Sequence, residues 1–183
     1  MNTILSEKDY QAFILDKLKL ENGFIIRKAS NYDRYFALDR ELLFKFLNDT
    51  QPETMEVLSK IYKDKLEETI ISYINSETTK KRGSLIDILR HGIELSNQKL
   101  ELMYTKPATT FNQELIDLYE KNIFSVMEEV GASDEERIDL VIFLNGLAIM
   151  SFELKCNFAG QSVDNAIEQY RKSRNPKTRL FFI

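Results

Sequence analysis

The chain has 183 residues, 43% of them hydrophobic, and a formal net charge of −4 at pH 7. Its length fits a single domain, and its net negative charge excludes a protein that coats nucleic acid through bulk positive charge. No apolar run reaches the about 18 residues of a membrane span, and the N-terminal MNTILSEKDY lacks the regions of a secretory signal. The single cysteine, Cys156, excludes an internal disulfide. We therefore expect a cytoplasmic protein.

The first part of the chain, residues 1–98, is mainly helical by its pattern. Apolar residues at helical spacing, a cap at Ser6 and a terminating Gly92 predict helices over residues 6–20, 39–47, 52–76 and 84–92. Between the first two helices, FIIRKA at 24–29 predicts a short strand. We therefore expect residues 1–98 to form a helical elaboration within one domain that spans residues 1–183.

The second part, residues 99–183, alternates strands with helices. KLELMY at 99–104 predicts a strand, and FNQELIDLYEK at 111–121 predicts a helix. Apolar runs then predict a β-β-β-α-β series, with strands at 123–130, 137–144 and 147–155, a helix at 162–173 and a final strand at 178–183. This order indicates an α/β fold. Because the sequence stops at the apolar run RLFFI, we expect it to be a fragment of a longer polypeptide.

Three charged residues interrupt the apolar hairpin that the second and third of these strands form. Asp139 lies within a strand, where an unpaired ionised carboxylate would cost several kcal/mol. Glu153 and Lys155 share one face of the next strand, because residues two apart point the same way. A salt bridge at the rim of the sheet would explain these charges structurally, whereas a catalytic site would explain them if all three converge.

The connection at Asn145-Gly146 decides whether the charges converge. A two-residue type I′ turn, which this dipeptide favours, pairs Leu144 with Leu147. In that register Asp139 points away from Glu153, and the charges do not form one cluster.

A three-residue connection, closed by a glycine in the left-handed conformation, pairs Phe143 with Leu147 instead. Asp139 then lies opposite Ser151 and shares a face with Glu153, because one residue of register exchanges the two faces of a strand. We expect this odd-length connection, since it gathers the charged side chains on one face of the sheet.

Two carboxylates and a lysine on one face have a chemical use. Mg²⁺ takes oxygen ligands and needs only one or two protein carboxylates, here Asp139 and Glu153, and the backbone carbonyl of Leu154 is an additional ligand. A bound metal lowers the pKa of a coordinated water and steadies the charge of a phosphodiester. Lys155 could orient or help deprotonate the attacking water and offset phosphate charge.

Asp139 followed by Glu153-Leu154-Lys155, in this order of elements, resembles the PD-(D/E)xK nuclease core, with Ile138 in the place of the proline. The longer block IDLVIFLNGLAIMSFELKCNFAGQSVDNAIEQYRKSRNP is similar to the N-terminal endonuclease domain of the R subunit of type I restriction enzymes. SEKDY, ENGF, YDRYFALDRELLFKFL, TQPE, LRHGIE and YEKNIFSV also resemble that family, so the similarity covers essentially the whole chain. It implies a restriction-endonuclease-like core, with a central mixed β-sheet flanked by helices.

The resemblance also implies an activity and partners. It implies a Mg²⁺-dependent endonuclease that cuts duplex DNA with little sequence preference of its own. Methyltransferase and specificity subunits would select the DNA site within the restriction complex. The family's ATP-driven motor would lie in another part of the polypeptide, since this sequence has no GxxxxGK[ST] motif, and ATP is therefore expected only for that part.

The resemblance further implies supporting residues. In such nucleases a glutamate of the first helix often completes the metal site, and Glu7 is the best-placed candidate here, although at a helix N-terminus it also suits the helix dipole. Related nucleases carry Gln-x-x-x-Tyr after the lysine strand. Gln169 matches the glutamine, but Ser173 occupies the tyrosine position and Tyr170 directly follows the glutamine. The basic run contributes candidate DNA contacts or a solvated helix face: Arg171, Lys172, Arg174 and Lys177.

Two other functions compete with catalysis. A nuclease-like fold could serve as a non-catalytic module for DNA binding or subunit docking, but such a module would not need the intact Asp139, Glu153 and Lys155. A small-molecule α/β enzyme lacks support, because the sequence has neither a glycine-rich phosphate loop nor a nucleophile elbow.

Overall fold

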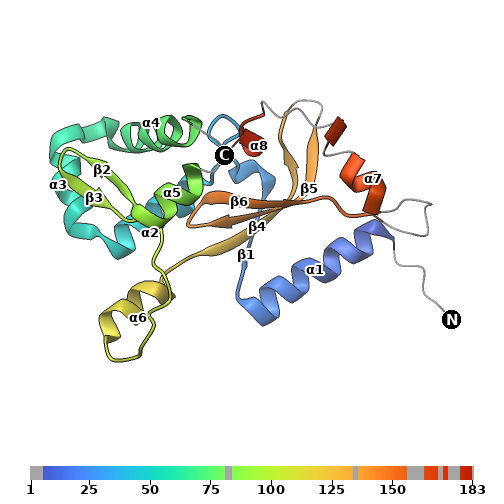
Figure 1. The fold of residues 1–183 in the computed structure, drawn as a ribbon, viewed down its shortest axis with the longest axis horizontal. Coiled ribbons are helices and arrows are strands. Elements are labelled where there is room, and N and C mark those ends of the chain that lie inside the picture. Colours follow the sequence, from blue (N-terminus) through green and yellow to red (C-terminus); the bar gives the residue numbers. More distant parts are fainter. Residues whose placement is uncertain are drawn as a thin grey trace.

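A mixed four-stranded β-sheet forms the centre of the protein (Figure 1). The computed structural model describes residues 6–80, 84–133, 136–155, 163–168, 171–172 and 178–182. The strand order is β1-β4-β5-β6, with β1 (Ile25–Arg27), β4 (Phe124–Gly131), β5 (Arg137–Leu144) and β6 (Leu147–Phe152). β1 pairs in parallel with β4, and the other neighbours are antiparallel. The predicted α/β class with a mixed sheet is confirmed, while the restriction-endonuclease-like assignment stays a prediction.

Helix α1 (Glu7–Asn22) packs along one face of this sheet (Figure 1). Ser6 caps the helix as predicted: its hydroxyl accepts a hydrogen bond from the Asp9 backbone N–H at 3.1 Å, and the Asp9 carboxylate accepts one from the Ser6 N–H at 3.0 Å. Gly23 ends the helix with φ 70°, a conformation that glycine adopts readily. The apolar contact joins Ile14, Leu15 and Leu18 of the helix to Val126, Leu140 and Leu154.

A second layer stands at one end of the sheet and contains the largest hydrophobic core cluster (Figure 1). Its members are the 3₁₀-helix η2 (Lys63–Lys65), helices α2 (Arg40–Thr50), α3 (Pro52–Tyr62), α4 (Leu66–Thr79) and α5 (Ser84–His91), and strands β2 (Ile93–Leu95) and β3 (Gln98–Leu100). Leu144 and Leu147, from the two ends of the β5–β6 turn, are buried in the same cluster. The turn of the β5–β6 hairpin is therefore packed into the helical layer.

The single helix predicted over 52–76 is wrong, because the chain breaks at Lys63, which has φ 52° and ψ −129°. A straight helix of that length would extend about 38 Å and carry half of its apolar stripe away from one core. Breaking at the polar Lys63–Lys65 segment folds α4 back beside α3, so that Leu58 and Ile70 are buried in one cluster.

The hairpin β2–β3 was only half predicted. The structure has a strand at Gln98–Leu100, which overlaps the predicted 99–104 strand only at Lys99 and Leu100, and pairs it with the unpredicted β2. Ser96 and Asn97 form the connection with φ values of 50° and 59°. Two successive residues at positive φ are typical of a type I′ hairpin turn, so Ser-Asn between IEL and QKL was the signal that sequence reasoning missed.

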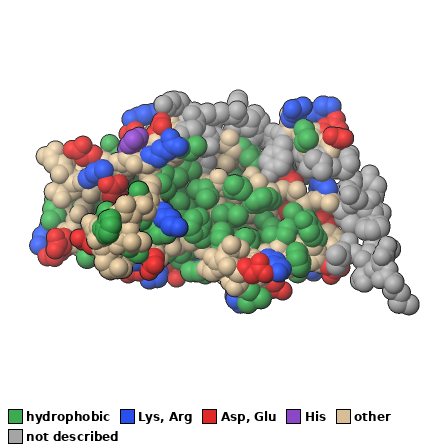
Figure 2. All heavy atoms as spheres, turned by 60° about the horizontal axis from the view of Figure 1, so that its bottom comes forward, with side chains coloured by type: hydrophobic (Ala, Val, Ile, Leu, Met, Phe, Trp, Pro, Cys, Tyr) green, Lys and Arg blue, Asp and Glu red, His purple; other side chains and the backbone are tan. Residues whose placement is uncertain are grey.

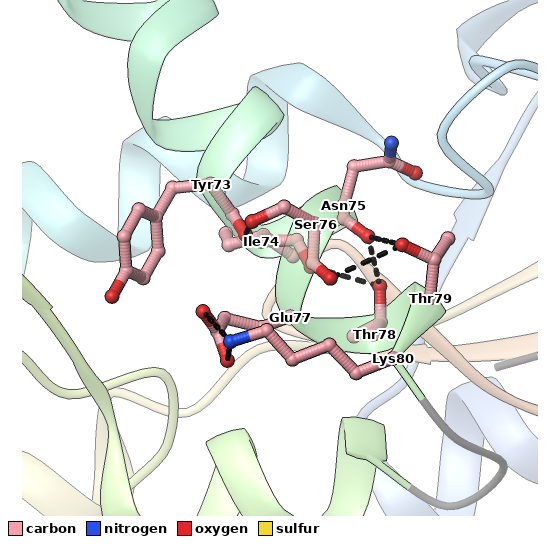
Figure 3. Close-up of polar contacts among 8 residues, drawn as sticks. All are labelled: Tyr73, Ile74, Asn75, Ser76, Glu77, Thr78, Thr79 and Lys80. Atoms are coloured by element: carbon pink, nitrogen blue, oxygen red, sulfur yellow. Dashed lines mark hydrogen bonds and ion pairs between the residues drawn. The ribbon is translucent and has the colours of Figure 1, made fainter.

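The C-terminal end of α4 is rich in hydroxyl side chains that bond to its own backbone (Figure 3). The Thr78 hydroxyl donates to the Ile74 carbonyl at 2.8 Å, and the Thr79 hydroxyl to the Asn75 carbonyl at 2.9 Å. Lys80 forms an ion pair with Glu77 at 2.6 Å. The buried Thr78 hydroxyl also accepts a hydrogen bond from Arg179, which ties the C-terminal segment to α4.

The final strand predicted at 178–183 is wrong for the part that the structure describes, where Arg179–Phe182 form the short helix α8. Leu180 is buried in a second core cluster that includes Phe143, so one helical turn buries the apolar side chain without a strand ladder. Tyr32 packs edge-on against Phe143, with 6.0 Å between ring centroids, and burial raises the pKa of Tyr32 above its usual range.

The remaining elements are short. They are the 3₁₀-helix η1 (Ala29–Asn31), α6 (Gln113–Glu120) and α7 (Val163–Glu168). α6 and α7 lie inside the helices predicted at 111–121 and 162–173. Because β1 belongs to the central sheet, the sheet draws on residues before 98, and the division of the domain at that position stays a prediction.

Among the described residues, no helix is long and apolar enough to cross a bilayer. Hydrophobic side chains nevertheless gather over the middle of the face shown in Figure 2. The exposed apolar residues of the sheet strands are Ile25, Ile26, Phe124, Ile149, Met150 and Phe152.

Candidate active site

The turn between β5 and β6 has two residues, so the predicted odd-length connection is wrong. Leu144 pairs directly with Leu147. Asn145 and Gly146 have φ values of 50° and 80°, which are the positive angles of a type I′ turn. If this turn alone set the register of the strands, Asp139 and Glu153 would point to opposite faces of the sheet.

A β-bulge in β6 restores the register that brings the charges together. Phe143 pairs with Ala148, but Ile142 pairs with Met150, so Ile149 is an extra residue in β6. The pairing then continues to Leu140 opposite Phe152. The pairing ends there, and the same register continued by one step would put Asp139 opposite Glu153. The extra residue that we expected in the turn is therefore Ile149, the third residue after Gly146, and Ser151 pairs with Val141 instead of the predicted Asp139.

Asn145 fixes the two-residue turn, because it is buried and both polar groups of its side chain are hydrogen-bonded. Its side-chain carbonyl accepts a hydrogen bond from the Ile123 N–H at 2.6 Å. Its amide nitrogen donates to the Leu102 carbonyl at 2.9 Å and to the Asn122 side chain at 3.0 Å. These contacts fix the tip of the hairpin to the segments that precede β4.

Asp39 holds the other residue of the turn. Its backbone N–H donates to the Gly146 carbonyl at 2.7 Å, and a Cβ on Gly146 would meet the Asp39 carbonyl at 2.4 Å. The fully buried Asp39 carboxylate caps α2 through the Leu42 N–H at 3.2 Å and binds the Arg27 guanidinium at 2.8 and 3.2 Å. This ion pair raises the pKa of Arg27 above its usual range.

Asp139 is anchored by the backbone of the strand segment that carries the other charges. The Leu154 N–H donates to Asp139 Oδ2 at 2.5 Å. Leu154 itself is buried against Val126 and Leu140 under α1. The hydrogen bond therefore fixes the orientation of one carboxylate oxygen of Asp139 relative to Glu153 and Lys155.

Lys155 lies between two carboxylates. Its Nζ is 3.9 Å from Glu153 Oε2 and 3.8 Å from Glu7 Oε1. The Glu153 side chain is 2% exposed and that of Lys155 17%, so this part of the site is largely withdrawn from solvent. Glu7 Oε1 is also buried and accepts no hydrogen bond from the described residues, although the side chain as a whole is 42% exposed.

A cleft of about 930 Å³ opens beside these residues, between α1 and the strands β4 and β5. Glu7 and Asp139 line it together with Gln11 and Glu128, whose side chains are joined by a hydrogen bond of 3.2 Å from Gln11 Nε2 to Glu128 Oε2. Sequence reasoning missed these last two residues. The available signal was a glutamine one helical turn after Glu7, on the face of α1 that turns toward the sheet.

The side chains fit a hard divalent cation without forming a closed cage. Within the described ranges, no three His, Cys, Asp or Glu side chains lie close enough together to hold a metal ion. Mg²⁺, however, keeps several of its waters and uses one or two protein carboxylates. Asp139 and Glu153 would supply these, and Glu7 Oε1 accepts no hydrogen bond from the described residues. The carboxylate and carbonyl donor set is therefore suited to Mg²⁺ rather than to a soft metal.

The C-terminal residues of the predicted site are placed only in part. Gln169, Arg174 and Lys177 lie outside the described residues, as do Tyr170 and Ser173. Arg171 and Lys172 are described and exposed, and Lys172 forms an ion pair with Glu168. The structure thus brings together Glu7, Asp139, Glu153, Leu154 and Lys155, and the roles of all these residues stay predictions.

Comparison with known proteins gives one match. A family model described as the type I restriction enzyme R protein N terminus matches residues 4–182. No curated protein and no solved structure matches the chain.

Proposed function

The chain belongs to the family of type I restriction enzyme R protein N-terminal regions, and on this premise we propose that it is a Mg²⁺-dependent endonuclease domain for duplex DNA. The observation that carries this proposal is the convergence of Asp139, Glu153 and Lys155, with Asp139 held by the Leu154 N–H at 2.5 Å. The family supports a hydrolase of a restriction enzyme. The dependence on Mg²⁺ and the low sequence preference are our own extension.

Asp139 and Glu153, with the backbone carbonyl of Leu154, would hold the metal. When bound, Mg²⁺ would lower the pKa of a coordinated water and offset charge on the phosphodiester. The protein contributes preorganisation: the hydrogen bond from the Leu154 N–H orients Asp139, and the withdrawal of Glu153 from solvent strengthens its electrostatic interactions.

Lys155 is suited to assist the attacking water. Its distances of 3.8 and 3.9 Å to Glu7 and Glu153 exceed the 2.7–3.2 Å of a direct hydrogen bond. The two carboxylates therefore attract the ammonium without fixing it in one close ion pair. Lys155 can turn toward a phosphate oxygen or the attacking water while remaining in the site.

Type I restriction enzymes are multi-subunit assemblies that act on DNA, and we propose methyltransferase and specificity subunits as partners of the complete R protein in the cytoplasm. ATP would serve only the motor part of that protein. Gln169 would help to position DNA or Lys155, and the basic side chains of Arg171, Lys172, Arg174 and Lys177 would contact the phosphate backbone.

The test uses Asp139→Ala and Lys155→Ala in the complete R protein, assembled into its restriction complex. We expect both to abolish DNA cleavage while ATP hydrolysis and DNA translocation continue. Asp64→Ala and Lys65→Ala are matched controls, since both residues are exposed in η2, and they should cut DNA normally. Undiminished cleavage by Asp139→Ala, with translocation intact, would leave the non-catalytic DNA-binding or docking module as the better reading.

A further inference from the structure

We infer that Gln11 and Glu128 form a positioning pair that holds the first turn of α1, and with it Glu7, against Lys155. This inference rests on the proposed nuclease function and adds residues that act through Glu7 rather than on the DNA. It concerns the same cleft, which Gln11, Glu128, Glu7 and Asp139 all line.

The burial of Gln11 is the first observation. In α1, which the structure describes in full, Gln11 is the only buried residue, at 8% exposure. A polar side chain buried at this position would lose free energy unless it were hydrogen-bonded. Its Nε2 donates to Glu128 Oε2 at 3.2 Å, and a bond to a charged acceptor is stronger than one between neutral groups.

The place of Gln11 along the helix is the second observation. The side chains by which α1 packs in the apolar cluster on the sheet, Ile14, Leu15 and Leu18, all follow Gln11 in the sequence. Glu7 lies four residues before Gln11 and therefore on the same helix face, one turn closer to the N-terminus. Along α1, the Gln11–Glu128 hydrogen bond thus lies between Glu7 and the side chains that pack on the sheet. It limits how far the first turn of the helix can move.

The place of Glu128 on β4 is the third observation. Glu128 pairs with Leu140, the neighbour of Asp139 on β5. The next residue, Glu129, has φ 52°, a conformation that is unfavourable for a side chain other than glycine or asparagine. After this irregularity Val130 packs into the core cluster of Phe143, away from α1. Glu128 therefore links α1 to the strand position beside Asp139.

These contacts connect both walls of the cleft. If the hydrogen bond is lost, the first turn of α1 is free to move, and Glu7 moves away from Lys155. Because displacement of a catalytic group by about 1 Å can lower a rate by about 100-fold, the loss should appear in the cleavage step. Binding of DNA elsewhere and folding of the sheet should change little.

An exchange of the two groups tests this role in the assembled complex. Gln11→Glu places two carboxylates against each other, and the double variant Gln11→Glu/Glu128→Gln restores one amide–carboxylate bond with the partners exchanged. The matched control is Gln113→Glu: Gln113 donates to Asp117 at 2.7 Å on exposed α6, so the same substitution creates the same repulsion on a helix that does not line the cleft.

We expect Gln11→Glu to lower the cleavage rate at saturating DNA by about 10- to 100-fold, with an unchanged Kd for DNA and unchanged ATP hydrolysis. The double variant should recover most of this loss, and Gln113→Glu should cut normally. If Gln11→Glu does not fold, Gln11→Met removes the donor without adding charge and should show the same selective loss of cleavage.

Three results would overturn the inference: cleavage at the normal rate in Gln11→Glu or Gln11→Met, a loss confined to DNA affinity, or a folded double variant that recovers nothing. Asp139→Ala separates this failure from that of the proposed function. Continued cleavage by Asp139→Ala refutes the nuclease assignment itself. Inactive Asp139→Ala together with fully active Gln11→Glu refutes only the positioning role.

Discussion

Replacing Gly146 by alanine should destabilise the protein by about 2–5 kcal/mol. A left-handed backbone costs a residue with a Cβ about 1–2 kcal/mol, and Gly146 has φ 80°. The new Cβ would also lie 2.4 Å from the Asp39 carbonyl oxygen and 2.6 Å from the Leu43 backbone nitrogen. Both are backbone atoms at the start of α2 and cannot rotate away, so overpacking adds about 1–3 kcal/mol.

Gly23→Ala is the control that separates these two contributions. Gly23 has φ 70°, but no atom lies within 4 Å of its added Cβ, so only the backbone strain remains. Urea unfolding of the purified protein, followed by circular dichroism, gives both free energies if the m-values agree. The reasoning is refuted if Gly146→Ala costs no more than Gly23→Ala, because the contact with Asp39 would then contribute nothing.

Three further substitutions probe the surrounding structure. Arg27→Met leaves the buried carboxylate of Asp39 without its guanidinium and should cost about 3–5 kcal/mol in urea unfolding; a cost below that of an exposed ion pair would contradict it. Lys63→Gly relieves the backbone at φ 52° and should stabilise the protein by about 1 kcal/mol, read as a higher Tm. Burial raises the pKa of Tyr32, so its contribution to stability is complete below the ordinary tyrosine pKa and declines as pH rises toward the raised value. As the pH is raised, the free energy of unfolding of Tyr32→Phe should therefore decrease less than that of the unchanged protein. Equal decreases would refute this.

Periodicity predicted the central strands well because each is a local pattern. The strand at 137–144 has the predicted bounds, and the charged residues Asp139 and Glu153 within apolar runs identified the hairpin that carries the candidate site. The predicted convergence depended on an odd number of residues between the strands. The location of that residue could not be predicted, because the bulge at Ile149 depends on contacts distant in the sequence. Leu38 bridges to Leu147, and the Ala148 N–H donates to the Ala37 carbonyl at 3.4 Å.

The other misses have the same origin. The stripe over 52–76 continues through the break at Lys63, so periodicity alone cannot show where the chain folds back. The apolar run at the C-terminus would suit a strand or a buried helical turn, and only its packing against Phe143 distinguishes them. Gln11 was missed because a single polar residue on a helix carries no pattern, although its burial becomes evident once α1 is placed on the sheet.

The buried turn at Asn145-Gly146 limits how this protein can be engineered. Hairpin tips are usually tolerant sites for peptide insertion or circular permutation, whereas here an insertion would separate the hairpin from Asp39 and the helical layer. The exposed loop around Phe111, which is 94% exposed, is the better site. For the same reason, truncation to residues 99–183 should not yield a stable core, because it removes α1, β1 and the contacts of Asp39 with the turn. The helical layer holds the β5–β6 hairpin in place, so the two have to be expressed and redesigned together.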